Sequence, residues 1–121
     1  IFCVNWFRKS PEGKFMWPGF GDNFRVLLWI IARCEGKVDA VDTAIGYVPK
    51  PEDIDLTGLD YEIKKGHKFT IDDLKSILTI DKDSWIADLD SIKEFYGKFS
   101  EGKVPKELWA ELAKLEENLT K

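Results

Sequence analysis

The stretch FMWPGFGDN, residues 15–23, decides how the N-terminal part of this sequence folds. It carries three large aromatic side chains together with one proline and two glycines. Proline presets φ and glycine tolerates positive φ, so the stretch is typical of a turn. Loops are normally polar, and a turn this rich in rings needs a reason. The rings either pack under a neighbouring body or hold a flat ligand.

Composition and charge exclude several function classes. The 121 residues include 18 basic and 22 acidic side chains, and the net charge of −4 argues against nucleic-acid or anionic-membrane binding. The apolar run Val26 to Ala32 is much shorter than the ~20 residues that span a bilayer. Cys3 and Cys34 lack metal-site spacing, and two thiols are too few for a disulfide framework, so we expect a reducing, cytoplasmic location. We therefore expect no nucleic-acid partner and no membrane.

The N-terminal residues predict a β-hairpin. Residues 1–8 are rich in aromatic and β-branched residues, residues 10–13 (SPEG) form a turn signal, and residues 15–17 resume an extended pattern. The sequence begins at Ile1 directly with this strand pattern. We therefore expect the chain to be a fragment of a longer polypeptide.

A helix is predicted from Phe24 to Cys34, with Asp22 or Asn23 as its N-terminal cap and Gly36 after its end. Its middle is apolar on every face, and such a helix needs burial all round. A chain of this length supplies too little cover, which again indicates a longer protein. Residues 37–69 read mostly as a loop with a short extended piece at 45–49, and we expect them to wrap around a neighbouring body. His67, which has no partner at ligand spacing, is interpreted as a surface residue.

Three helices are predicted at the C-terminal end. Thr70 and Asp73 have capping-box spacing at the start of a short helix that reaches about Leu78. Two further helices follow, over about 82–99 and after Pro105. Their apolar stripes predict an antiparallel helical hairpin and consist of Trp85, Leu89, Ile92, Tyr96, Phe99, Leu108, Leu112, Leu115 and Leu119. The predicted fold class is α+β: an N-terminal β-hairpin followed by about four α-helices.

The sequence offers no catalytic apparatus. It has no Ser-His-Asp set, no paired cysteine ligands and no GxxxxGK[ST] phosphate loop, and its carboxylates are spread over helix surfaces. We therefore expect no catalytic residue and no metal ligand in the chain.

The aromatic cluster is the remaining candidate site. The predicted hairpin brings Phe7 near Phe15, and Phe20 projects from a turn between two glycines. Facing rings form a slot for a flat heterocycle, where stacking contributes ~1–3 kcal/mol per base. Asn23 offers a donor and an acceptor suited to a base edge. The alternative, rings that pack against a hidden core, stays open on these grounds.

The segments VNWFRK (residues 4–9) and KFMWPGFGDNFRVL (residues 14–27) resemble the C-terminal region of GTP-dependent phosphoenolpyruvate carboxykinases, and IGYVP (residues 45–49) fits the same family. The resemblance covers essentially the whole chain. It implies a parent enzyme of mixed α/β fold that converts oxaloacetate and GTP to phosphoenolpyruvate, CO2 and GDP, with Mn²⁺ and Mg²⁺ as cofactors. It also implies that the phosphate loop and metal ligands lie upstream, so that the fragment alone is not catalytic.

The resemblance assigns roles by motif position. Phe7 and Phe20 would sandwich the guanine, Phe15 would line the pocket, Asn23 would contact the base edge and Trp17 would buttress the slot. The chain would then comprise a guanine-binding hairpin, loop and helix (1–36), a wrapping loop (37–69) and C-terminal helices (70–121), with guanine nucleotide and the rest of the parent chain as partners.

Two departures from the family pattern stand beside the base-contacting residues. Phe24 replaces a small polar residue, and Asp22 replaces glutamate. Two rival interpretations remain, a pyrophosphate-dependent relative and a non-enzymatic interaction domain with buried aromatics. The three phenylalanines argue against the first, because pyrophosphate has no ring to stack.

Overall fold

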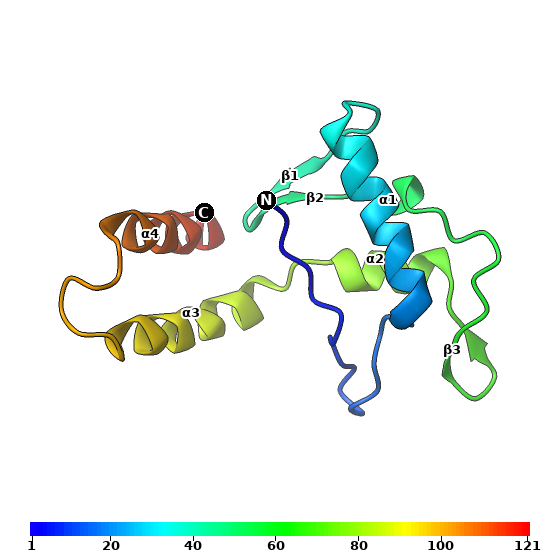
Figure 1. The fold of residues 1–121 in the computed structure, drawn as a ribbon. Coiled ribbons are helices and arrows are strands. Elements are labelled where there is room, and N and C mark those ends of the chain that lie inside the picture. The colour runs from blue at the N-terminus through cyan, green and yellow to red at the C-terminus, as the bar shows by residue number, and fades with distance from the viewer. The chain divides into compact units, whose positions relative to one another are not determined.

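The computed structural model describes residues 1–121, which divide into two compact units (Figure 1). The first unit comprises residues 1–41 and 47–79, and the second comprises residues 42–46 and 80–121. Four α-helices and two small two-stranded sheets give the α+β fold class that the sequence predicts. None of the helices has the length and apolar character needed to cross a membrane.

The regular elements begin at Phe20 and are joined by turns and loops. The first unit holds α1 (Asn23–Cys34), α2 (Ile71–Leu78), the 3-10 turns η1 (Phe20–Asp22) and η2 (Pro51–Asp53), and the antiparallel pair β3 (Glu62–Lys64) and β4 (His67–Lys68). The strands β1 (Val41–Thr43) and β2 (Gly46–Val48) pair with each other. The second unit holds α3 (Lys82–Gly97) and α4 (Lys106–Thr120).

The predicted N-terminal β-hairpin is wrong, because all four strands follow α1 (Figure 1). The turn itself forms: the Gly13 N–H donates to the Ser10 carbonyl at 2.8 Å, and Lys9 and Phe15 make one isolated bridge. The predicted second strand, residues 15–17, ends at Pro18, because proline has no N–H to donate to a neighbouring strand. The strand is therefore long enough to pair only with the residues next to the turn. The strands lie instead in the stretch 37–69, where the sequence predicts mainly loop.

Helix α1 forms where predicted, but neither candidate residue caps it with its side chain. The Asp22 carboxylate accepts a hydrogen bond from Arg25, and the Asn23 amide oxygen accepts one from Trp17. The helix ends as expected, with Gly36 at a φ of 70° and the Lys37 N–H donating to the Ala32 carbonyl at 2.9 Å.

A single apolar core holds the first unit together. We call it the Trp17 core; its buried members are Trp17, Trp29, Ile54, Phe69 and Leu74. Trp17 packs edge-to-face on Phe69, with 5.7 Å between ring centroids. Trp29 is the buried residue of α1. Other large apolar side chains of α1 remain 43–57% exposed to solvent, namely Phe24, Leu27, Leu28 and Ile31. Within this chain the helix is covered on one side.

The predicted capping box starts α2. The backbone N–H and the hydroxyl of Thr70 both donate to Asp73 Oδ2, each at 2.8 Å. His67 is a surface residue, as predicted, but its Nε2 lies 2.9 Å from Asp73 Oδ1 and joins β4 to this helix start. Partial burial alone would raise the pKa of Asp73. The hydrogen bonds from Thr70 and the neighbouring His67 outweigh that effect and hold the pKa below its usual value.

The second unit is the predicted helical hairpin, in which α3 and α4 run antiparallel (Figure 1). Its core consists of Leu89, Leu112 and Leu119, with Trp85, Ile92, Tyr96 and Leu115 packed around them. Asp81 caps α3 by accepting a hydrogen bond from the Ser84 N–H at 3.0 Å. One residue at the end of each predicted stripe lies outside this core: Phe99 of the first stripe and Leu108 of the second remain exposed.

Replacement of Asp73 by Asn should lower the free energy of unfolding by about 1 kcal/mol at pH 7, because it weakens the cap of α2. A carboxyl with a depressed pKa contributes stability above its unfolded-state pKa and loses it as pH falls through the folded-state pKa. The difference between wild type and Asp73→Asn should therefore begin to shrink only below about pH 4 and vanish once the pH lies below the folded-state pKa of Asp73. Urea unfolding at several pH values measures this.

Asp72→Asn is the matched control, because the neighbouring Asp72 side chain is exposed and pairs only with Lys75 at 3.4 Å. An equal loss in this control, or a difference for Asp73→Asn that persists at low pH, would contradict the role of Asp73.

Candidate functional site

The structure brings Phe7 and Phe15 together beside the turn at residues 10–13. Their rings meet edge-to-face with 6.1 Å between centroids, and both remain exposed. The Lys9 ammonium lies 5.2 Å from the centroid of the Phe15 ring, and the Tyr61 hydroxyl donates to the Phe15 carbonyl at 3.2 Å. The two rings and the cation thus form one accessible aromatic patch.

Phe20 stands apart from these rings and is 99% exposed. It forms no ring pair with Phe7 or Phe15, so the chain by itself does not close a slot between them. Its φ of 47° makes it the single non-glycine residue with positive φ, next to Gly19 at 73°. A bulky residue is strained there, by about 1–3 kcal/mol, and such strain clusters at ligand clamps. The turn therefore holds a large apolar ring in solvent at an energetic cost.

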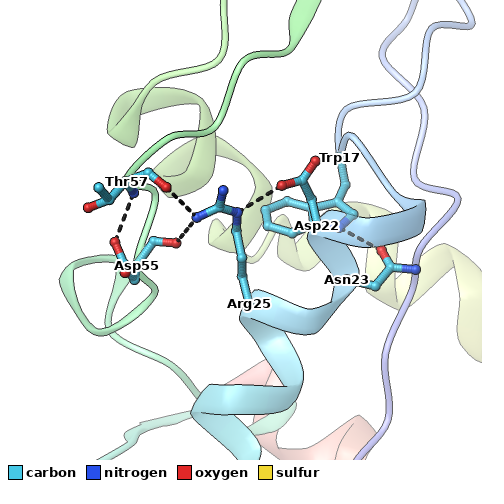
Figure 2. Close-up of polar contacts among 6 residues, drawn as sticks. All are labelled: Trp17, Asp22, Asn23, Arg25, Asp55 and Thr57. Carbon is cyan, nitrogen blue, oxygen red and sulfur yellow. Dashed lines mark hydrogen bonds and ion pairs between the residues drawn. The ribbon is translucent and has the colours of Figure 1, made fainter.

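Asn23 is held by Trp17 (Figure 2). The Trp17 indole Nε1–H donates to Asn23 Oδ1 at 2.9 Å, and Asn23 is half-buried at the start of α1. The amide nitrogen of Asn23 points away from Trp17 and has no hydrogen-bond partner within the chain. A free N–H donor thus stands three residues beyond the exposed Phe20 ring.

Arg25 ties the start of α1 to the loop after η2, a role that could not be predicted from sequence spacing (Figure 2). Its Nε donates to Asp22 Oδ1 at 2.9 Å, and its Nη1 donates to the carbonyls of Asp55 at 2.7 Å and Thr57 at 3.0 Å. Hydrogen bonds from Thr57 and the nearby Arg25 charge lower the pKa of Asp55. The partners lie 30 and 32 residues away, where no local spacing reveals them.

Other parts of the chain offer less to a ligand. Groups of three or more His, Cys, Asp or Glu side chains that could hold a metal ion are absent. One surface cavity is lined by Arg25, Trp29 and Asp55, and another by Lys14, His67 and Asp73. Arg25, His67 and Asp73 already bind one another or the backbone. The exposed rings and the free amide of Asn23 are therefore the strongest candidate site.

Comparison with known proteins agrees with the motif. Residues 1–118 match the family described as the phosphoenolpyruvate carboxykinase C-terminal P-loop domain. The chain belongs to this family. Phosphoenolpyruvate carboxykinase (GTP) from Renibacterium salmoninarum is 48% identical over 119 residues, and that from an Arthrobacter species is 47% identical over 119 residues. The protein of the same name from Corynebacterium glutamicum is 42% identical over 120 residues.

The chain spans 18% of the length of these relatives, while 98–99% of it takes part in each match. It therefore corresponds to one segment of a phosphoenolpyruvate carboxykinase. The GxxxxGK[ST] pattern of a phosphate loop does not occur within its 121 residues.

Replacement of Arg25 by Met should release the loop around residues 55–57 from α1. The substitution removes three hydrogen bonds from one guanidinium and leaves two carbonyls and a carboxylate without their partner. The free energy of unfolding should therefore fall by about 1–3 kcal/mol. Thermal unfolding, with hydrogen exchange of residues 53–59, measures the effect.

Arg33→Met is the control: Arg33 lies on the same helix and makes one hydrogen bond, at 3.2 Å to the Val38 carbonyl. Equal effects of the two variants would contradict this role of Arg25.

Proposed function

We propose that this chain is the guanine-binding part of a GTP-dependent phosphoenolpyruvate carboxykinase. In the assembled site Phe7 and Phe20 stack on opposite faces of the base, Phe15 lines the pocket and Asn23 contacts the base edge. The observation that carries the proposal is Phe20, a ring almost fully exposed in a strained turn just before a free amide donor.

The exposure of these rings favours a flat ligand. A phenylalanine ring exposed to water forgoes the burial that normally stabilises aromatic side chains, and Phe20 adds backbone strain to that loss. A purine inserted between two rings recovers ~1–3 kcal/mol through stacking. Lys9, close to the Phe15 ring, supplies positive charge beside the base for an anionic nucleotide.

The proposed reaction of the whole enzyme is the conversion of oxaloacetate and GTP to phosphoenolpyruvate, CO2 and GDP. Mn²⁺ and Mg²⁺ are its proposed cofactors, but the side chains of this chain do not fit either ion, because they form no suitable ligand cluster. We assign metal binding, phosphate binding and catalysis to the rest of the enzyme. The chain alone is expected to bind the base at most.

The rest of the enzyme is also the proposed protein partner. The exposed apolar residues of α1, among them Phe24 and Leu28, suit burial against another part of the same polypeptide. We assign base binding to residues 1–36, contact with the remaining lobe to residues 37–69 and the closing helices to residues 70–121. The free thiols of Cys3 and Cys34 support a cytoplasmic location.

The same apolar face favours one alternative, a non-enzymatic interaction domain. Guanine-nucleotide titration of the full-length protein separates the two. Trp6 and Trp17 flank the aromatic patch in the sequence, so base binding should quench tryptophan fluorescence more strongly with GDP than with ADP. An emission spectrum unchanged by both nucleotides would favour the interaction domain.

Phe20→Ala in the full-length enzyme should weaken GTP binding by about 1–3 kcal/mol, because it removes one stacking face. Oxaloacetate binding should change much less, since the ring does not reach that substrate in the proposed arrangement. Calorimetric titration of both ligands measures this. Phe95→Ala serves as control, because Phe95 is another exposed phenylalanine but lies on α3. A GTP affinity that is unaltered in Phe20→Ala would refute the assignment of Phe20.

A further inference from the structure

We propose that Trp17 determines which base the site accepts, because it fixes the orientation of the Asn23 carboxamide. This inference rests on the proposed function. It adds a positioning residue to that site.

An asparagine that nothing holds can present either end of its amide to a ligand. The carboxamide oxygen and nitrogen have similar size, and rotation about the terminal bond exchanges them. A base with an acceptor and a base with a donor would then bind with comparable affinity. Discrimination requires a second group that distinguishes oxygen from nitrogen.

The Trp17 indole is such a group. Its Nε1–H donates and cannot accept, so the atom facing it at 2.9 Å must be the oxygen of Asn23. A rotated amide would set two donors against each other and leave a buried indole N–H without a partner. That penalty disfavours the rotated state by roughly tenfold or more.

Trp17 is itself immobilised by the fold. It is 5% exposed and packs edge-to-face on Phe69, within a core that also contains Leu74 of α2. Asn23 is the first residue of α1, so its backbone is fixed by the helix. Both partners of the hydrogen bond are therefore held before a ligand arrives, and the free Nδ2–H2 group points away from the indole (Figure 2).

The consequence for the base follows from its edge chemistry. Guanine carries an acceptor oxygen at position 6, whereas adenine carries an amino group that donates at the same place. A fixed N–H donor can hydrogen-bond to the oxygen of guanine, but it faces another donor in the amino group of adenine. The site should therefore accept guanine and other 6-oxopurines and reject adenine.

Trp29 provides a matched control within the same core. It is 6% exposed and packs edge-to-face on Phe2 with 6.2 Å between centroids, much as Trp17 packs on Phe69. Its indole Nε1, however, has no hydrogen-bond partner in the chain. Trp17→Phe and Trp29→Phe thus remove equivalent buried indoles, and only the first removes a hydrogen bond to Asn23.

The experiment measures the dissociation constants of GDP and ADP by calorimetry in the full-length enzyme. The ratio of the ADP to the GDP constant should fall about tenfold or more in Trp17→Phe and stay at the wild-type value in Trp29→Phe. Equal changes of both constants in Trp17→Phe, with the ratio preserved, would show that Trp17 acts only as a core residue and would overturn the inference.

Asn23→Asp supplies a second test that does not disturb the core. One carboxylate oxygen accepts from Trp17, and the other faces the base as an acceptor, so the preference should move towards adenine. A guanine preference retained in Asn23→Asp would overturn the inference even where Trp17→Phe fails to fold. A wild-type enzyme without any guanine preference would instead overturn the proposed function itself.

Discussion

The hydrogen bond from Trp17 to Asn23 is the interaction on which the candidate site depends. It joins a buried core residue to the first residue of α1 across the turn that carries Phe20. Because the donor lies in the Trp17 core, the start of the helix, the strained turn and the free amide are positioned together. The packing of the first unit and the chemistry proposed for the base edge therefore have a common origin.

Arg25 extends this arrangement beyond the turn. It binds Asp22 at the helix start and two carbonyls of the loop at residues 55–57, so the first turn of α1 is tied to a distant part of the chain. The same unit leaves large apolar side chains exposed on α1 and in the aromatic patch. Rigid polar anchoring beside exposed apolar groups suits the proposed binding of a base and of the rest of the enzyme.

The sequence predicted the features that local rules govern. The four helices, the end of α1 at Gly36, the capping box of Thr70 and Asp73 and the antiparallel pairing of α3 and α4 all follow from periodicity and turn chemistry. It failed on the strands, which lie after α1, and on the cap of α1, which neither Asp22 nor Asn23 provides with its side chain. Trp17 and Arg25 compete for those two side chains, and such contacts leave no periodic signal. The motif supplied the candidate residues, but it could not show which end of the Asn23 amide is free.

A crystal structure of the full-length enzyme with bound GDP would show whether Trp17 and Asn23 orient the base as proposed. The base should lie between the rings of Phe7 and Phe20, with Asn23 Nδ2 donating to the oxygen at position 6 and Oδ1 still accepting from Trp17. A guanine bound away from these two rings would refute the proposed stacking, and an Asn23 amide whose oxygen faces the base would refute the role of Trp17.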